Sequence, residues 1–303
     1  MRMNSTRIKK SNHQGKPPTP SRHHAPRTPR THQARGQRPS LPRHEAPRTT
    51  RAAASTSWEQ SAVWYRTHLL RADTLQRSVI FPKTLALLAP QRGKHYLDIG
   101  CGEGSFARSV QITGALVSGI DASPTLVAHA TQRCPRGTFS VADARRLAQS
   151  FPAASFDGAT CILALQNIDP FVPVMRDAAI VLRSGAPLVI VLNHPCFRIP
   201  RQSGWGWDEQ RGLQYRRIDR YLTPLEAPIE MHPGTPSSSV TMSFHRPLSA
   251  YTQALTAHGF AITAIEEWIS DRTSDRGPRA RAEDAARREF PMFLAIRAKK
   301  MLT

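Results

Sequence analysis

The sequence predicts an α/β fold in which a doubly wound, seven-stranded and mostly parallel sheet carries helices on both faces. The first observation behind this prediction is the alternation of short apolar runs with helical stretches over residues 95–193. Apolar strands separated by helices are typical of parallel sheets covered on both sides. The second observation is a glycine-rich turn, Gly100, Gly102 and Gly104, directly after the first apolar run. Open parallel sheets bind ligands at this position, beyond the carboxyl ends of their strands.

Residues 1–57 are predicted to form a disordered basic tail, rich in proline and arginine, ahead of a folded domain at residues 58–303. The tail holds 13 Lys and Arg against one acid, Glu45, so it carries +12 of the formal charge of +20. Its apolar residues are too few and too scattered to bury. Three interpretations remain open: a solvated extension, a basic arm that contacts nucleic acid or anionic surfaces, and an organelle-targeting peptide.

The folded domain begins with two predicted helices, at residues 58–73 and 78–90, in which apolar residues recur at helical spacing. Five strands and four helices then alternate. The strands are expected at residues 95–99, 115–121, 138–143, 156–165 and 187–193. The helices between them are expected at residues 104–112, 123–133, 144–150 and 171–183.

The alternation stops after the fifth strand. Residues 194–246 form a long, irregular stretch with several aromatic and arginine residues, and such a segment inside a compact domain is usually a lid or a binding loop. We therefore expect an inserted lid on the acceptor side. A helix at 247–259 and strands at 260–269 and 291–300 complete the domain, and the charged residues 271–289 are expected to form a loop, with or without a helical turn.

The composition excludes several classes of protein. No run approaches the roughly 18–20 apolar residues of a membrane span, and the chain does not start with a secretory signal pattern. The cysteines have neither a CxxC pair nor any metal-ligand spacing, which predicts no disulfide framework and no metal site. They are Cys101, Cys134, Cys161 and Cys196. The expected location is cytoplasmic.

Two acids near the glycine-rich turn indicate its ligand. The glycines follow the pattern GxGxG, whereas a dinucleotide fingerprint has GxGxxG. Asp98 lies two residues before Gly100, where a carboxylate would repel a pyrophosphate but attract a cationic amino or sulfonium group. Asp121 ends the next predicted strand, where it can accept from both hydroxyls of a ribose. These residues together predict a nucleoside with a cationic tail.

Four stretches, LDIGCGEG, GID, VADA and FDGATCILALQNI, resemble in order and strand position the cofactor motifs of class I S-adenosylmethionine-dependent methyltransferases. The resemblance covers about residues 58–300 and extends through NHPCFRIP, HRPLSAYTQAL and FLAIRAKK. In these later stretches the chain is similar to the small-molecule, type 11-like branch of that family. The resemblance implies a Rossmann-like sheet and S-adenosyl-L-methionine as the cofactor.

The resemblance also implies a role for each residue of the cofactor site. Asp98 would bind the methionyl ammonium, Asp121 the ribose hydroxyls, and the glycines would let the cofactor approach the backbone. Residues 120, 122, 143 and 144 would surround adenine. The predicted cofactor-binding residues are Asp98, Gly100, Cys101, Gly102, Gly104, Asp121, Ala122, Asp143, Ala144 and Leu163.

Other interpretations of three of these residues remain open. Asp121, like Ser123, could cap the following helix, and Asp143 could cap the helix at 144–150. Cys101 is expected to be a packing residue rather than a nucleophile, because no nearby histidine activates it.

On the acceptor side, positioning is expected to matter more than a fixed catalytic triad, because methyl transfer from a sulfonium is an in-line displacement. His194 follows the fifth strand directly and is the best candidate for a general base, with an anchoring hydrogen bond as the alternative. Tyr221 is the second catalytic candidate. Trp205 and Trp207 form, with Tyr221, either an aromatic wall for a flat acceptor or the core of the lid itself. The expected pocket also includes Gln166 and Asn167.

The leading functional hypothesis is methylation of an oxygen or carbon atom of a small-molecule acceptor. Two alternatives remain open: nucleic-acid methylation aided by the basic tail and by arginines of the predicted lid, and a cofactor-binding regulator without turnover. Those arginines are Arg211, Arg216, Arg217 and Arg220. Under the leading hypothesis nucleic acid is a partner only through the tail, and the sequence predicts no oligomeric state.

Overall fold

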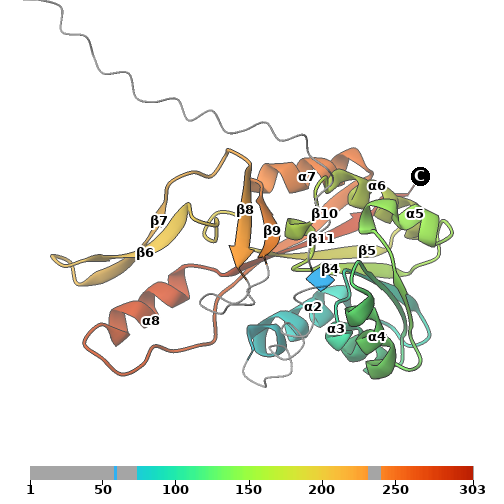
Figure 1. Ribbon diagram of the computed structural model, residues 1–303, viewed down its shortest axis with the longest axis horizontal. Coiled ribbons are helices and arrows are strands. Elements are labelled where there is room, and N and C mark those ends of the chain that lie inside the picture. The colour runs from blue at the N-terminus through green and yellow to red at the C-terminus, as the bar shows by residue number, and fades with distance from the viewer. Residues whose placement is uncertain (1–57, 60–73, 231–239, 303) are drawn as a thin grey trace, which may run out of the picture. The chain divides into compact units, whose positions relative to one another are not determined.

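A seven-stranded sheet lies at the centre of the computed structural model, which describes residues 58–59, 74–230 and 240–302 (Figure 1). Its strands lie in the order β10-β11-β5-β4-β1-β2-β3, and β11 is antiparallel to both of its neighbours while the other pairs are parallel. The strands are β1 (His95–Ile99), β2 (Leu116–Asp121), β3 (Thr138–Val141), β4 (Gly158–Ile162), β5 (Pro187–Asn193), β10 (Phe260–Trp268) and β11 (Phe293–Lys300). The predicted sheet is confirmed, whereas the predicted tail at 1–57 lies outside the described residues.

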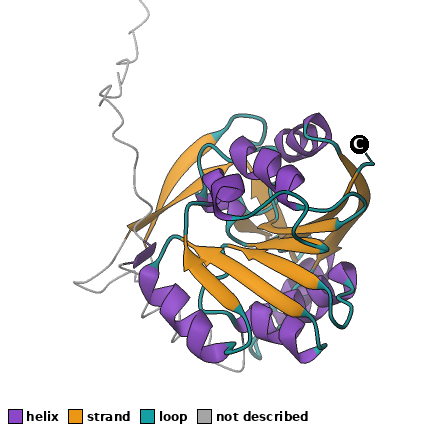
Figure 2. Ribbon diagram, turned by 90° about the vertical axis from the view of Figure 1, so that its right-hand side faces the viewer, coloured by secondary structure: helices purple, strands orange, loops and turns teal. Residues whose placement is uncertain are grey.

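Helices cover both faces of the twisted sheet, as Figure 2 shows. Residues of α5, α6 and α7 join one buried cluster, and residues of η1, α2 and α3 join a second cluster on the opposite face. No helix within the described ranges is long and apolar enough to cross a bilayer. The helices are η1 (Gln76–Ile80), α2 (Phe81–Leu88), α3 (Ser105–Ile112), α4 (Pro124–Arg133), η2 (Ala144–Arg146), α5 (Leu147–Ser150), η3 (Leu165–Asn167), α6 (Val172–Val181), α7 (Leu248–Ala257) and α8 (Ala280–Glu289).

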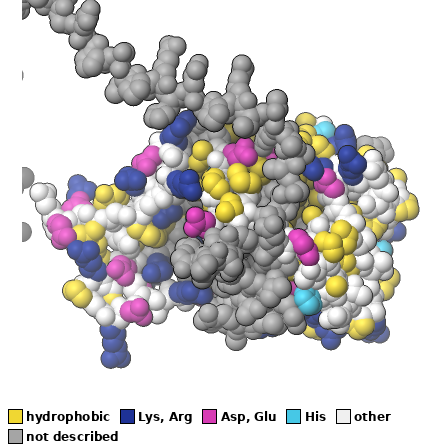
Figure 3. All heavy atoms as spheres, viewed as in Figure 1, with side chains coloured by type: hydrophobic (Ala, Val, Ile, Leu, Met, Phe, Trp, Pro, Cys, Tyr) yellow, Lys and Arg dark blue, Asp and Glu magenta, His cyan; other side chains and the backbone are white. Residues whose placement is uncertain are grey.

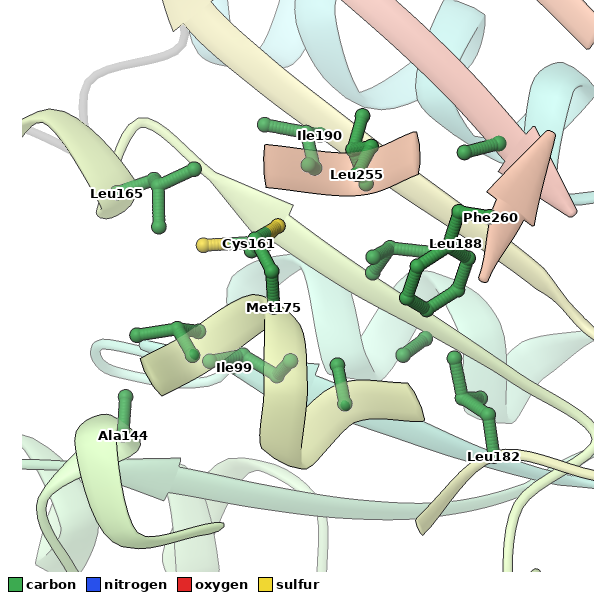
Figure 4. Packing of buried hydrophobic residues seen from close by; sticks show 14 of the residues in the cluster. Ile99, Ala144, Cys161, Leu165, Met175, Leu182, Leu188, Ile190, Leu255 and Phe260 are labelled. Atoms are coloured by element: carbon green, nitrogen blue, oxygen red, sulfur yellow. The ribbon is translucent and has the colours of Figure 1, made fainter. Parts of the chain in front are cut away.

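The strand β5 shows why the central strands are continuous apolar runs. Leu188 and Ile190 join the cluster that includes Leu255 of α7 (Figure 4). Val189 and Val191 belong to the cluster on the other face. Because successive side chains of a strand point to opposite faces, a strand covered on both sides needs apolar residues at every position.

The strand order reverses between β1 and β4. From β1 the chain continues through β2 and β3 toward one edge of the sheet, and then returns to build β4 and β5 on the other side. The loops that leave the carboxyl ends of β1 and β4 therefore lead in opposite directions. A crevice for a ligand is expected at this point in an open parallel sheet.

Residues 194–246 contain two β-hairpins, so the expectation of an irregular stretch is wrong. The strand β6 (Ser203–Asp208) pairs with β7 (Leu213–Ile218), and β8 (Leu225–Glu230) pairs with β9 (Val240–His245), each pair as a separate two-stranded sheet. The turn between β6 and β7 contains Gly212, with a φ of 58°. A glycine-containing turn between the stretches GWGWD and LQYRRI is typical of a hairpin. The strands are hard to recognise in the sequence because they contain few aliphatic residues.

Three further boundaries differ from the sequence predictions. Residues 280–289, predicted as part of a loop, form the ten-residue helix α8. The strand predicted at 156–165 ends at Ile162, because Leu163 has a φ of 53° and the 3-10 helix η3 follows. Of the helix predicted at 58–73, only Trp58 and Glu59 are described, both in helical conformation.

Gly104 is expected to resist substitution by alanine. Its φ is 82°, and an added Cβ would lie 2.9 Å from the Cα of Ala130 on α4. Because the substitution adds both backbone strain and overpacking, Gly104→Ala is expected to lower the free energy of unfolding by about 2–4 kcal/mol, measured by urea denaturation. Gly277→Ala is the control, since no heavy atom lies within 4 Å of its added Cβ. Equal losses in the two variants would contradict this explanation.

Candidate active site

The glycine-rich turn lies at the carboxyl end of β1 and is held by β2. The N–H groups of Gly100 and Cys101 both donate to the carbonyl oxygen of Ile120, at 2.9 Å each. Gly100 has a φ of 72°, and an added Cβ would lie 2.5 Å from the Cβ of Ala164. Glycine is therefore needed both for the left-handed conformation and for the close approach of the loop that follows β4. This contact brings the ends of β1 and β4 together.

Asp98 is a buried carboxylate on β1, with 3% of its surface exposed. Its Oδ1 accepts a hydrogen bond from the Thr160 hydroxyl on β4 at 2.9 Å. Among the described residues, no Lys or Arg forms an ion pair with it. Burial raises the pKa of Asp98 to about 7, because the hydroxyl of Thr160 offsets only part of the loss of solvent and the nearby Asp121 adds repulsion.

Asp121 ends β2 and organises the backbone around the turn. Its Oδ2 accepts from Gly102 N and its Oδ1 accepts from Ser123 N, both at 2.9 Å. Burial raises the pKa of Asp121 despite these hydrogen bonds. The cap of α4 is Ser123, whose Oγ accepts from Leu126 N at 3.1 Å. Of the two caps considered from the sequence, Ser123 is the one observed.

The two carboxylates fit a cationic, hydroxyl-bearing ligand. Asp98 and Asp121 lie at the ends of neighbouring parallel strands; Asp98 is buried and Asp121 is partly buried, and neither has a cationic partner among the described residues. Uncompensated carboxylates in one place are unfavourable in the free protein. A ligand with an ammonium group and hydroxyl donors would relieve this, so these residues fit S-adenosyl-L-methionine.

The next predicted cofactor residues follow β3. Asp143 caps the 3-10 helix η2 by accepting from Arg145 N at 2.9 Å, and it forms an ion pair with the Arg145 guanidinium at 2.7 Å. These hydrogen bonds from Arg145 hold the pKa of Asp143 below its usual value. The capping alternative is therefore observed for Asp143, and the predicted contacts of Asp143 and Ala144 with adenine remain predictions.

Cys101 is a packing residue in this structure. It is 7% exposed and unoxidised, and burial raises the pKa of its thiol well above the ordinary value. A thiol that resists ionisation is a poor nucleophile. Its Cβ lies 2.8 Å from the Cβ that Gly119 lacks, so the side chain fills space between β1 and β2.

Glu59 is a site residue that the sequence analysis missed. Its carboxylate accepts hydrogen bonds from the hydroxyls of Ser123 and Thr125, and from Thr125 N at 3.3 Å. It thus contacts the first turn of α4, beside Asp121, and its charge contributes to the raised pKa of Asp121. A glutamate in an amphipathic helix looks like an ordinary surface residue, so no sequence signal indicates this contact.

A cavity of about 420 Å³ lies next to the ligand-binding edge of the sheet. Leu163, Gln166 and Asn167 line it from the loop after β4, and Asn193 lines it from the end of β5. The hairpins and the segment before them complete its wall, with Arg198, Arg216 and Ile229 among the contributors. Gln166 and Asn167, predicted for the acceptor pocket, are in this lining, and so is Leu163, which was predicted to bind the cofactor.

Hydrogen bonds hold the strained end of β4 in place. Gln166 Oε1 accepts from Asn193 N at 3.0 Å, which ties the loop after β4 to the end of β5. Asn167 Nδ2 donates to the carbonyl oxygen of Leu163 at 3.1 Å, and Leu163 N donates to Val191 O at 2.8 Å. These bonds support the positive φ of Leu163, which is costly for a residue with a side chain. Strain of this kind is concentrated at functional sites.

His194 and Tyr221 do not line the described cavity. His194 is 2% exposed; its Nδ1 accepts from Cys196 N at 3.2 Å, and its Nε2 donates to Glu267 at 2.7 Å. The lone pair that a base would use is therefore occupied, and burial lowers the pKa of His194. The Tyr221 hydroxyl accepts from Leu248 N at 2.9 Å. This geometry favours the anchoring alternative for His194 and disfavours the predicted catalytic role of both residues.

The tryptophans of β6 pack within the protein. The ring of Trp205 contacts that of Phe290, with 5.6 Å between centroids, and the Arg279 guanidinium lies 4.5 Å from the centre of Trp207. Neither tryptophan lines the described cavity. These contacts, with Phe290 and Arg279 outside the predicted lid, correspond neither to an acceptor wall in this cavity nor to a core of the lid itself.

The arginines of the predicted lid do not form one basic surface. Arg217 pairs with Asp219 at 2.9 Å, and Arg211 lies 3.8 Å from Asp208. Figure 3 shows basic and acidic side chains interspersed over β6, β7 and α8. Arg216 differs from these two because it lines the cavity.

Sequence comparisons match part of the chain to known proteins. A family model described as a methyltransferase domain matches residues 97–190. Demethylmenaquinone methyltransferase of Tropheryma whipplei (strain Twist) is 36% identical over 110 residues, which cover 36% of this chain and 46% of that protein. O-methyltransferase cnsE of Penicillium expansum is 40% identical over 119 residues, with 36% and 42% covered. The chain thus matches less than half the length of these curated relatives.

Structure comparison extends the similarity over most of the described chain. An S-adenosylmethionine-dependent methyltransferase from Mesorhizobium loti is 30% identical and superposes with a TM-score of 0.60. The match covers 75% of this chain and 98% of that one.

Burial of Asp98 is expected to make the free protein less stable as the pH rises. Its folded pKa of about 7 lies above the value of about 4 for an exposed aspartate. The folded state therefore binds the proton more tightly, and stability falls between about pH 4 and pH 7. The substitution Asp98→Asn removes this titration. The free energy of unfolding of the variant is expected to be higher than that of the wild type by about 1–3 kcal/mol at about pH 8, and by less at about pH 5. Urea unfolding at both pH values measures the difference.

Asp157→Asn is the matched control for this charge removal. Although burial acts to raise it, hydrogen bonds from His95 N and Arg183 hold the pKa of Asp157 below its usual value. Folding therefore stabilises the ionised form of Asp157, and its contribution is lost as the pH falls. Asp157→Asn should lower stability at about pH 8. A similar loss in Asp98→Asn would show that the carboxylate of Asp98 is not strained in the free protein.

Proposed function

Since the chain belongs to the S-adenosylmethionine-dependent methyltransferases, we propose that it methylates an oxygen or carbon atom of a small molecule bound in the cavity beside β4 and β5. The observation that carries the proposal is the adjacency of two sites. Ala164 contacts the glycine-rich turn at Gly100, and its neighbour Leu163 lines the cavity. A cofactor on the turn and an acceptor in the cavity would therefore meet at the end of β4.

The proposed cofactor site uses residues from three strand ends. S-adenosylmethionine supplies a methyl group activated by the positive sulfonium. Asp98 is proposed to bind the ammonium group, directly or through water, because it is a buried carboxylate that has no cationic partner in the described part of the chain. Asp121 accepts from the ribose hydroxyls, while Gly100, Gly102 and Gly104 allow the ligand to lie against the backbone. Ala122, Asp143 and Ala144 contact adenine.

Orientation is the main contribution proposed for the protein. Holding the nucleophile, methyl carbon and sulfur in line can supply roughly 7–11 kcal/mol of the barrier. Leu163 is the residue best placed to orient the methyl group, because it lines the cavity and hydrogen bonds from its N–H to Val191 O and from Asn167 Nδ2 to its carbonyl oxygen hold it in a strained conformation. His194 acts as an anchor between β5 and Glu267 of β10 rather than as a base.

Two observations support a small-molecule acceptor. The cavity volume of about 420 Å³ lies within the range of roughly 300–1,000 Å³ that is typical of small-ligand sites. The curated relatives are named as a demethylmenaquinone methyltransferase and as O-methyltransferases, one of ubiquinone biosynthesis. These names favour oxygen or carbon as the methylated atom in this chain too.

The proposal is tested by methyl transfer from cofactor labelled in the methyl group to pools of small hydroxylated and enolisable compounds. Label is expected in at least one compound, and S-adenosylhomocysteine is expected to bind the wild type and to inhibit the transfer. Failure of the wild type to bind both S-adenosylmethionine and S-adenosylhomocysteine would overturn the proposal. Label found in RNA but in no small compound would overturn the choice of acceptor.

Asp121→Asn is expected to weaken binding of S-adenosylhomocysteine by about 10- to 100-fold, because it removes charge-assisted hydrogen bonds to the ribose hydroxyls. Isothermal titration calorimetry measures the change. Asp157→Asn removes the same charge at the opposite edge of the sheet, where Asp157 accepts from His95 N at the start of β1, and should leave the affinity unchanged. Equal affinities of the wild type and Asp121→Asn would argue against ribose binding at this residue.

A further inference from the structure

Three arginines line the cavity, and two of them, Arg198 and Arg216, are partly buried and come from different segments, whereas Arg201 is exposed. Arg198 follows β5 and Arg216 belongs to β7, and both line the cavity. Arg216 Nε donates to the carbonyl oxygen of Phe197 at 2.7 Å, which places its guanidinium beside the segment that carries Arg198. The hairpin β6–β7 thus brings a second positive charge to the end of β5.

Neither arginine is neutralised by an acid among the described residues. Arg198 Nη1 donates to Asn193 Oδ1 at 2.6 Å, and Arg216 Nη2 donates to Ser203 Oγ at 3.0 Å. All of their described hydrogen-bond acceptors are neutral. The segments outside the described residues contain only two acids, Glu45 and Asp73.

Aromatic rings hold both guanidinium groups in position. The Arg216 guanidinium lies 5.0 Å from the centre of the Trp205 ring, and that of Arg198 lies 5.5 Å from the centre of the Phe293 ring. Burial lowers the pKa of both arginines, and the charge of Arg216 lowers that of Arg198 further. Two positioned cations that repel each other form an unfavourable arrangement in the free protein, which an anion would relieve.

Part of the remaining wall is suited to an apolar body, while polar side chains such as Gln166 and Ser243 line the rest. Leu163, Ile199 and Ile229 line the same cavity as the arginines. An acceptor of mixed character would place its apolar part against these side chains and its charged part against the guanidinium groups. Planar guanidinium groups match the geometry of a carboxylate well.

We propose that the methyl acceptor carries a carboxylate, which binds to Arg198 and Arg216 while its apolar body fills the cavity. This inference rests on the proposed function and adds the chemical class of the acceptor. It also separates the arginines of the β6–β7 hairpin by role: Arg216 selects the substrate, whereas Arg217 forms a surface ion pair with Asp219.

The test uses matched pairs of small acids and amides on protein saturated with S-adenosylhomocysteine. The pairs are benzoate with benzamide, 4-hydroxybenzoate with 4-hydroxybenzamide, and cinnamate with cinnamamide. Calorimetric titration is expected to show saturable binding of at least one acid, at least about tenfold tighter than its amide, because a hydrogen-bonded charge is lost in the amide.

Three variants assign the preference to the cavity. Arg216→Gln is expected to weaken binding of the acid by about 10- to 100-fold and to reduce the preference for acid over amide, and Arg216→Lys is expected to retain more of it. Arg217→Gln is the matched control on the neighbouring residue of β7 and should bind the acid like the wild type. Affinity for S-adenosylhomocysteine should remain unchanged in all three, which shows that each variant is folded.

The outcomes distinguish this inference from the proposed function. If the wild type binds S-adenosylhomocysteine but binds no acid of the panel, or binds each amide as tightly as its acid, the carboxylate proposal is overturned and the methyltransferase proposal stands. An acid preference that is as large in Arg216→Gln as in the wild type also overturns it. Failure of the wild type to bind S-adenosylhomocysteine overturns the proposed function itself.

Discussion

The hydrogen bond between the Thr160 hydroxyl and the buried Asp98 carboxylate joins β4 to β1 at the point where the strand order reverses. Burying this carboxylate, which is 3% exposed and has no cationic partner among the described residues, lowers the stability of the folded protein. The fold keeps it where the glycine-rich turn leaves β1 and where Ala164 contacts that turn. The glycine-rich turn and the strained end of β4 begin at this junction, and the cavity adjoins it through Leu163, Gln166 and Asn167.

The two sides of the site are constructed differently. The cofactor side consists of short loops that follow the ends of consecutive strands. Backbone N–H groups and a few acidic side chains form its binding groups. The acceptor side consists of two hairpins inserted after β5, and its wall mixes apolar side chains with arginines. Separate two-stranded sheets can change without disturbing the central sheet, since their hydrogen bonds do not join it. This division is consistent with a constant methyl donor and an acceptor specificity determined by the insertion.

The errors of the sequence analysis have physical causes. The helix α8 was not predicted because only Ala286 of its ten residues is buried, so apolar periodicity is almost absent. For His194 the sequence left two roles open, a base or an anchor, because the partners that occupy its ring, Cys196 N and Glu267, include a residue 73 positions away in the sequence. Arg216 and Arg217 look alike in the sequence, and only strand pairing turns one toward the cavity and leaves the other on the surface.

The sequence by itself determined the sheet, its helices and the nature of the cofactor. These depend on local features: continuous apolar runs such as PLVIVLN, glycines where φ is positive, and acids at the ends of strands. Only the tertiary structure decided how these features act. It showed that Asp98 is a buried carboxylate with no cationic partner among the described residues, that Glu59 reaches the first turn of α4, and that Arg198 and Arg216 share one cavity. Charge, burial and neighbours are properties of long-range packing, so a pattern along the chain does not contain them.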